Sequence, residues 1–83
     1  MKKTSISISL EDEQMARHIA LLVQKASKYE SAVYIQSGEK KVNAKSIMGM
    51  MTLGMGAGEE ITVSADGADE AVAMNEIEKY LRG

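Results

Sequence analysis

Ser46 is the side chain whose position in this sequence offers the most chemistry. It lies in VNAKSIMGMMTLGMG, residues 42–56, directly before a short apolar run. A serine immediately before a helix usually accepts a hydrogen bond from a free backbone N–H group of the first turn, and so acts as an N-cap. The same position also suits a phosphate group, because the free N–H groups and the helix dipole favour negative charge there. Spacing alone leaves both roles open, with Lys45 and either Lys40 or Lys41 as candidate neighbours of a phosphate.

His18 is the sole histidine of the chain, and there is no cysteine. At helical spacing His18 lies one turn after Met15 and beside an apolar set. A zinc-type site needs several imidazole or thiolate ligands, and the sequence has no second residue of either kind. No nucleophile, base and acid can be grouped either. We therefore expect no metal site, no cofactor and no enzymatic activity.

Several classes of function are disfavoured by composition. The glycines of GMGAG, residues 54–58, follow a predicted helix, whereas a phosphate-binding loop needs glycines that open a helix. The net charge of −2 gives no electrostatic case for direct binding of nucleic acid. No apolar run approaches the length of a membrane span, and the N-terminal MKKTSISISL lacks the apolar core of a signal peptide. We expect a cytoplasmic protein without direct membrane contact.

Hydrophobic periods predict the elements that position these residues. Ile6, Ile8 and Leu10 alternate with polar residues, which predicts a half-buried strand within residues 4–10. Helical spacing then predicts a helix over residues 11–29, with Asp12 as its candidate cap. The apolar face of this helix is assigned to Ala16, Ile19, Ala20, Val23 and Ala26, with Leu22 beside them.

A hairpin and a short helix follow. Residues 32–37 and 40–43 read as two strands with Ser37-Gly38 in the turn. The short helix is predicted over residues 46–53. It must stop at the glycine-rich segment that comes next.

The last two elements are a strand and a helix. Alternating apolar residues predict a strand within residues 59–67, closed by Asp66-Gly67. Asp69 is a candidate cap for the final helix. The element order is βαββαβα, the split β-α-β pattern in which an antiparallel sheet carries helices on one face. We predict an α+β fold that forms one domain over residues 1–83. The apolar set of the final helix is Met74, Ile77 and Leu81, with Ala71 and Tyr80 adjacent.

The short helix has apolar residues on two sides. Met50 and Leu53 lie three residues apart and can face the sheet, and a second set occupies another side. A helix of one to two turns on a sheet cannot bury both. An exposed apolar patch that contains methionine is typical of a partner-binding surface, although a neighbouring loop or helix is an alternative cover. The second set is Ile47, Met48 and Met51.

Three segments resemble the HPr family, the histidine-containing phosphocarriers of the bacterial sugar phosphotransferase system. They are ALLVQKAS, VNAKSIMGMMTLGMGAG and EEITVSADGADEA, and the resemblance extends over nearly the whole chain. It implies an HPr-like open-faced sandwich, in which three helices cover one face of a four-stranded antiparallel sheet.

The resemblance implies two phosphorylation sites, of which the first is altered here. In the family a histidine followed by Ala-Arg-Pro accepts phosphate from Enzyme I and passes it to sugar-specific proteins. The matching residues are Met15, Ala16, Arg17 and His18, and a thioether cannot accept and release a phosphoryl group as imidazole does. The acidic residues 11–13 would also repel an incoming phosphate. His18 lies roughly 5 Å further along the helix, which disfavours it as a substitute.

The second family site matches Ser46. In low-GC Gram-positive bacteria an ATP-dependent HPr kinase/phosphorylase modifies this serine, and the product acts as corepressor for a LacI-type catabolite control protein. The residues that the resemblance implies at this interface are Arg17, Ser46, Ile47, Met48 and Met51. A catabolite-repression branch of the family likewise lacks the histidine and keeps the serine.

Three hypotheses follow from the resemblance. The first is a regulatory protein that is phosphorylated on Ser46, carries no phosphate on histidine and acts by protein binding in carbon catabolite regulation. The alternative is a phosphocarrier of the phosphoenolpyruvate-dependent system, with Enzyme I and the sugar-specific proteins as partners. A third is a diverged relative with another transfer or binding role. Both monomer and dimer are consistent with the family.

Overall fold

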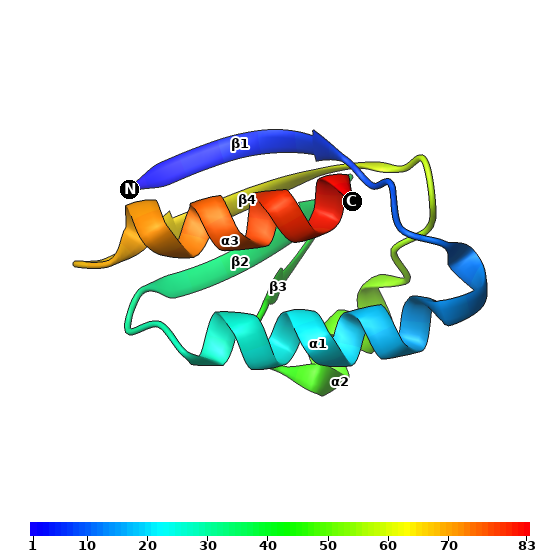
Figure 1. Cartoon of the computed structure of the whole chain (residues 1–83), viewed down its shortest axis with the longest axis horizontal. Coiled ribbons are helices and arrows are strands. Elements are labelled where there is room, and N and C mark those ends of the chain that lie inside the picture. The colour runs from blue at the N-terminus through cyan, green and yellow to red at the C-terminus, as the bar shows by residue number, and fades with distance from the viewer.

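The fold is a four-stranded sheet with its helices on one side (Figure 1). The computed structural model describes the backbone of residues 1–83 and every side chain except that of Asp12. The strands lie in the order β1-β4-β2-β3, and each neighbouring pair is antiparallel. The strands are β1 (Lys2–Ser7), β2 (Ala32–Ser37), β3 (Lys40–Asn43) and β4 (Glu60–Asp66).

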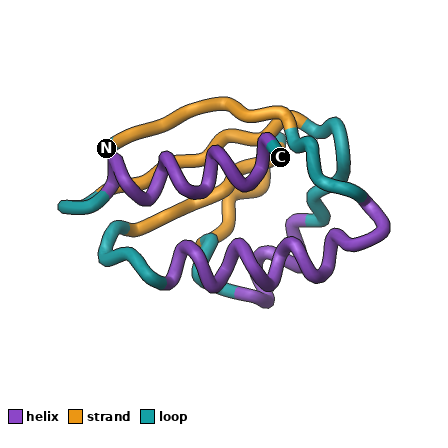
Figure 2. Tube along the Cα trace, in the orientation of Figure 1, coloured by secondary structure: helices purple, strands orange, loops and turns teal.

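The helices form the second layer and leave the other face of the sheet uncovered (Figure 2). Their order among the strands is βαββαβα, which confirms the predicted α+β class. None of the described helices is long and apolar enough to cross a membrane. The helices are α1 (Met15–Ser27), α2 (Ile47–Leu53) and α3 (Glu70–Arg82), with a single 3-10 turn, η1 (Asp12–Gln14), before α1.

Alternation along the strands places one face of the sheet in the core. Ile6 is opposite Ile61 on β4, and Ile35 is opposite Val63, so the buried side chains of three strands meet beneath the helices. The first strand ends at Ser7 rather than at residue 10. The chain then continues as an extended loop in which Ile8 N–H donates to the Glu59 carbonyl at 2.9 Å.

The hairpin between β2 and β3 has the predicted strands, but its turn is one residue further along. Ser37 pairs with Lys40, which leaves Gly38-Glu39 as the two loop residues. Gly38 has φ 60°, a left-handed conformation that tight hairpin turns require and that glycine adopts without strain.

The buried face of α1 differs from the predicted one. Met15, Ile19, Leu22 and Ala26 are buried, whereas Ala16 is exposed. The helix is therefore rotated so that the i, i+4, i+7, i+11 series from Met15 faces the sheet. On α3 the predicted Met74, Ile77 and Leu81 are buried as expected, and Ala71 is exposed.

Neither predicted aspartate cap is observed as such. The side chain of Asp12 lies outside the described residues, and the N-cap position of α1 is Gln14, whose side chain makes no capping bond. Asp69 stands at the N-cap of α3 but binds elsewhere. Its carboxylate accepts the Glu30 and Ser31 backbone N–H groups at 2.9 Å and also the Ser31 hydroxyl. These hydrogen bonds lower the pKa of Asp69, and the bond from the Ser31 hydroxyl has the largest effect. They also hold the loop before β2 against the start of α3.

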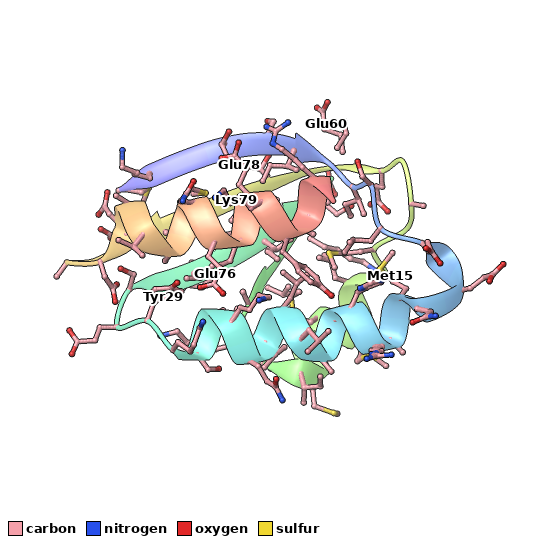
Figure 3. All side chains as sticks on the ribbon, in the orientation of Figure 1. Met15, Tyr29, Glu60, Glu76, Glu78 and Lys79 are labelled. Carbon is pink, nitrogen blue, oxygen red and sulfur yellow. The ribbon has the colours of Figure 1, made fainter. Side chains whose placement is uncertain are left out.

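The carboxylate of Glu76 joins α3 to the end of α1 (Figure 3). It accepts a hydrogen bond from the Tyr29 hydroxyl and ion-pairs with Lys25 Nζ at 3.2 Å and with Lys28 Nζ at 3.0 Å. The Tyr29 bond and then the Lys28 bond lower the pKa of Glu76 from its ordinary value to about 2. The ionised form is therefore favoured by folding.

The short helix α2 buries one side only. Met50 is 0% exposed and Leu53 is 6% exposed, whereas Ile47, Met48 and Met51 are 45%, 77% and 53% exposed. Gly54, with φ 68°, ends the helix in the left-handed conformation. The predicted division of α2 into a core side and a solvent side is confirmed.

We expect the interaction of Glu76 to depend on pH. Because the folded-state pKa is lowered, its stabilising contribution is complete above the unfolded-state pKa and is lost as pH falls towards about 2. Urea unfolding of the wild type and of Glu76→Gln should therefore show a clear stability gap at about pH 7 that narrows at about pH 3. A gap that is unchanged between these pH values would contradict the assignment. Glu78→Gln on the same helix is the matched control.

The exposures on α2 predict two classes of stability effect. Met50→Ala and Leu53→Ala should each lower the unfolding free energy by about 2–5 kcal/mol, because they empty packed space. Met48→Ala and Met51→Ala should each change it by less than about 0.5 kcal/mol, because solvent already surrounds these side chains. Chemical denaturation of the four variants measures this. Losses at Met48 and Met51 as large as those at Met50 would show that α2 is covered on both sides.

Candidate functional site

Ser46 is the N-cap of α2, as its position in the sequence predicts. Its φ and ψ of −102° and 112° are extended, and its Oγ accepts the Gly49 N–H at 3.1 Å. Its carbonyl accepts the Met50 N–H at 3.0 Å and so begins the helical bonding. The side chain is half-buried, so its hydroxyl oxygen caps the helix while part of the residue remains in solvent.

The turn before Ser46 is fixed by Asn43. The Asn43 side-chain oxygen accepts the Lys45 N–H at 2.8 Å, and its carbonyl accepts the Ser46 N–H at 3.0 Å. An asparagine that binds the backbone two residues later is a common turn-forming device. The local sequence thus sets the direction in which α2 leaves β3.

The lysines expected beside Ser46 are directed elsewhere. Lys45 Nζ donates to the Tyr29 carbonyl at 2.7 Å, which ties the start of α2 to the end of α1. Lys41 Nζ lies 5.0 Å from the centroid of the Tyr34 ring. Lys40 is exposed on β3. The Lys45 ammonium group therefore has a described partner other than Ser46, and its place beside a phosphate on Ser46 stays a prediction.

Gly49 is a residue whose role the sequence did not indicate. A Cβ added there would lie 3.4 Å from Ser46 Oγ and 3.4 Å from Val42 Cβ. These are ordinary van der Waals distances, so the contribution of this residue is its N–H, which donates to the Ser46 hydroxyl, rather than its missing side chain. Its position in the middle of the apolar run carried no signal that distinguishes it from a simple helix residue.

Ile47, Met48 and Met51 form an exposed apolar surface on α2, here called the α2 patch. The helix α1 packs against α2, and Arg17 is on the exposed side of α1. The exposed Arg17 guanidinium carries five N–H donors. The predicted interface residues thus lie on two neighbouring helices, with Ser46 at the start of one of them.

Met15 lies at the first position of α1 and belongs to the core. It is 9% exposed and is grouped with Leu10 and Met55 among the buried residues. Its side chain points inward from the start of the helix (Figure 3). Of the three acidic residues predicted near this position, Glu11 and Glu13 are exposed, and the side chain of Asp12 lies outside the described residues.

His18 faces α3 rather than α2. Its Nδ1 lies 2.6 Å from the Tyr80 hydroxyl oxygen, and the two rings meet edge to face with centroids 5.7 Å apart. Lys25 Nζ lies 5.3 Å from the centroid of the same Tyr80 ring. His18 is half-buried and links the two long helices through one nitrogen. Its partner Tyr80 was predicted only as a neighbour of the apolar set.

A metal-binding cluster and a cavity are the other features that could form a site. Among the residues whose side chains are placed, no group of three or more His, Cys, Asp or Glu residues could hold a metal ion. A shallow cavity of about 450 Å³ opens between α1 and α3, and none of the residues predicted as site residues lines it. The arrangement around Ser46 and the α2 patch is therefore the candidate functional site.

Comparison with known proteins identifies the family. A family profile described as "PTS HPr component phosphorylation site" matches residues 2–82. The HPr-like protein Crh of Bacillus subtilis (strain 168) is 39% identical over 82 residues, which span 99% of this chain and 96% of Crh.

Solved structures agree with the sequence comparison. The crystal structure of HPr-C-His from Thermoanaerobacter tengcongensis is 42% identical, with a TM-score of 0.92 over 98% of this chain and 91% of that chain. The crystal structure of Bacillus subtilis Crh, described as an intertwined dimer with domain swapping, is 40% identical, with a TM-score of 0.77 over 93% of this chain and 84% of that one. By profile, identity and fold, the chain belongs to the PTS HPr family.

Proposed function

We propose that this protein is a regulatory member of the HPr family, which carries no phosphate on histidine and acts by protein binding in carbon catabolite regulation. The observation that carries the proposal is the burial of Met15 at the position of the family's phosphorylated histidine. A second observation, the position of Ser46, supports the same proposal. Ser46, the match to the family's regulatory serine, lies beside an exposed apolar surface.

The position of Met15 argues against phosphate transfer on two grounds. A thioether has no nitrogen that could form and release a phosphoramidate, so the acceptor atom is absent. The side chain is also inside the core, so no surface pocket for a phosphoryl donor is built around it. The exposed carboxylates of Glu11 and Glu13 near the same helix start would repel an anionic donor.

The Ser46 region suits a phosphorylation-controlled docking surface. A phosphate on Ser46 would add nearly two negative charges next to the α2 patch and on the helix that packs against α1, the carrier of Arg17. Arginine binds phosphate through a planar pair of donors. The proposed partners are an HPr kinase/phosphorylase, which modifies Ser46, and a LacI-type catabolite control protein, which docks on the modified surface. The naming of the relative Crh as HPr-like is consistent with this branch of the family.

A phosphocarrier acting through His18 is the second candidate. The observation in its favour is the contact between Nδ1 of His18 and the Tyr80 hydroxyl: in the tautomer in which Nδ1–H donates to Tyr80, Nε2 is the ring nitrogen with a free lone pair. Enzyme I and the sugar-specific phosphotransferase proteins would then be partners. A second copy of the chain is a further candidate partner, since Crh of Bacillus subtilis crystallised as a swapped dimer.

Incubation with Enzyme I and labelled phosphoenolpyruvate should leave this protein unlabelled, because Met15 offers no acceptor. An HPr with an intact histidine is the positive control. Met15→His should restore little labelling, since position 15 lies in the core and the exposed carboxylates of Glu11 and Glu13 precede it. Acid-labile label that disappears in His18→Ala would instead establish the phosphocarrier function.

With ATP and HPr kinase/phosphorylase, mass spectrometry should show one added phosphate that is absent in Ser46→Ala. The phosphorylated protein should bind the catabolite control protein, and Arg17→Ala or Met48→Ala should weaken that binding. Ser27→Ala, at the exposed end of α1, is a control that should change neither result. Phosphate on another serine with Ser46 unmodified would overturn the assignment.

A further inference from the structure

We propose that Met48 and Met51 form a site of selective, reversible oxidation, at which a peroxide converts the α2 patch from apolar to polar without unfolding the protein. The consequence for docking rests on the proposed function. The selectivity and the change of surface do not, because they follow from the exposures of the methionines alone.

The seven methionines are divided sharply between core and solvent. Met15, Met50, Met55 and Met74 are each 9% exposed or less. The three others are Met1 at 76%, Met48 at 77% and Met51 at 53%. A peroxide reaches a thioether only through solvent, so the second group should react first.

The helix α2 carries both kinds of methionine side by side. Met50 is fully buried between two exposed neighbours in the sequence, Met48 two residues before it and Met51 one residue after it. All three lie within the same seven-residue helix. A difference in their rates of oxidation therefore reports exposure, and Met50 serves as an internal reference.

The chemical step needs a peroxide and a later thiol reductant. A lone pair of the Met48 or Met51 sulfur attacks one peroxide oxygen, the S–O bond forms and the O–O bond breaks. The leaving hydroxide takes the remaining proton and becomes water, so the sulfur is oxidised by two electrons and the peroxide is reduced by two. A methionine sulfoxide reductase reverses the step when a dithiol becomes a disulfide and the oxygen leaves as water.

The fold should tolerate this change because α2 is held by other groups. Met50 and Leu53 anchor the buried side, and the Ser46 cap and Gly54 fix the ends. The sulfoxides would project into water, where their polarity costs nothing. The patch, in contrast, loses most of its apolar character, because two of its three side chains become strong hydrogen-bond acceptors.

The test treats the full chain with hydrogen peroxide and follows each methionine by peptide mass spectrometry. Met48 and Met51 should gain one oxygen atom each well before Met50, Met55 or Met74. The native oxidised protein should elute earlier from a hydrophobic-interaction column, with its circular dichroism and urea midpoint unchanged. Methionine sulfoxide reductase with a dithiol should restore the original elution.

A double variant, Met48→Leu with Met51→Leu, keeps the patch apolar and removes the oxidisable sulfur. Its elution should respond to peroxide far less than that of the wild type, because only Met1 remains as an exposed sulfur, whereas Met1→Leu should respond nearly as the wild type does. With the catabolite control protein as probe, oxidation should weaken binding roughly tenfold or more in the wild type and should have no effect on the double variant.

Equal oxidation of Met50 and Met48, or unfolding that accompanies oxidation, would overturn the assignment of a selective site. Unchanged elution of the wild type after both sulfoxides have formed would overturn the change of surface. Absence of binding to the probe before oxidation would count against the proposed function and not against the oxidation site, which the mass and elution measurements decide. Binding that survives complete oxidation of Met48 and Met51 would overturn the effect on docking.

Discussion

The shortness of α2 is the constraint on which the surface of this protein depends. Seven residues make about two turns, so the helix can present one side to the sheet and must leave the other in solvent. Met50 and Leu53 take the buried side, while the Ser46 hydroxyl and the left-handed Gly54 terminate the two ends. Because these four residues hold the backbone, the α2 patch contributes little to packing. Its side chains are free to serve recognition, which is the role proposed for them.

The second organising feature is the polar coupling between α1 and α3. His18, in the first half of α1, contacts Tyr80 near the end of α3. Lys25, near the end of α1, and Tyr29, just after it, contact Glu76 in the middle of α3. Asp69, at the start of α3, binds the loop that leads into β2. These contacts fix two antiparallel helices at successive points along their length. They also direct His18 towards α3, whereas Ser46 caps α2, so the chain's one imidazole and this serine make contacts with different helices.

Local patterns were sufficient to predict most of the fold. Strand alternation, the hairpin and the two sides of α2 depend on spacing within a few residues, and the structure confirms them. The errors have a common cause in distant partners. Asp69 was placed by its immediate neighbours, but Ser31, whose backbone N–H and hydroxyl bind its carboxylate, is far away in the sequence. The face of α1 was misassigned because Ala16 is compatible with either side, and only the packing of Met15 decides the rotation.

The burial of Met15 indicates why the proposed loss of a carrier site would involve more than the loss of one atom. A phosphoryl acceptor must stay in water, because the doubly charged product could not be desolvated, whereas a methionine at the same place is stabilised by leaving water. The two residue types therefore demand opposite directions for the side chain at the start of α1. With that side chain in the core together with Leu10, the start of α1 exposes Glu11 and Glu13, whose carboxylates would repel an anionic donor. In the proposed function, the surface that changes its charge in contact with a partner is therefore the one around Ser46.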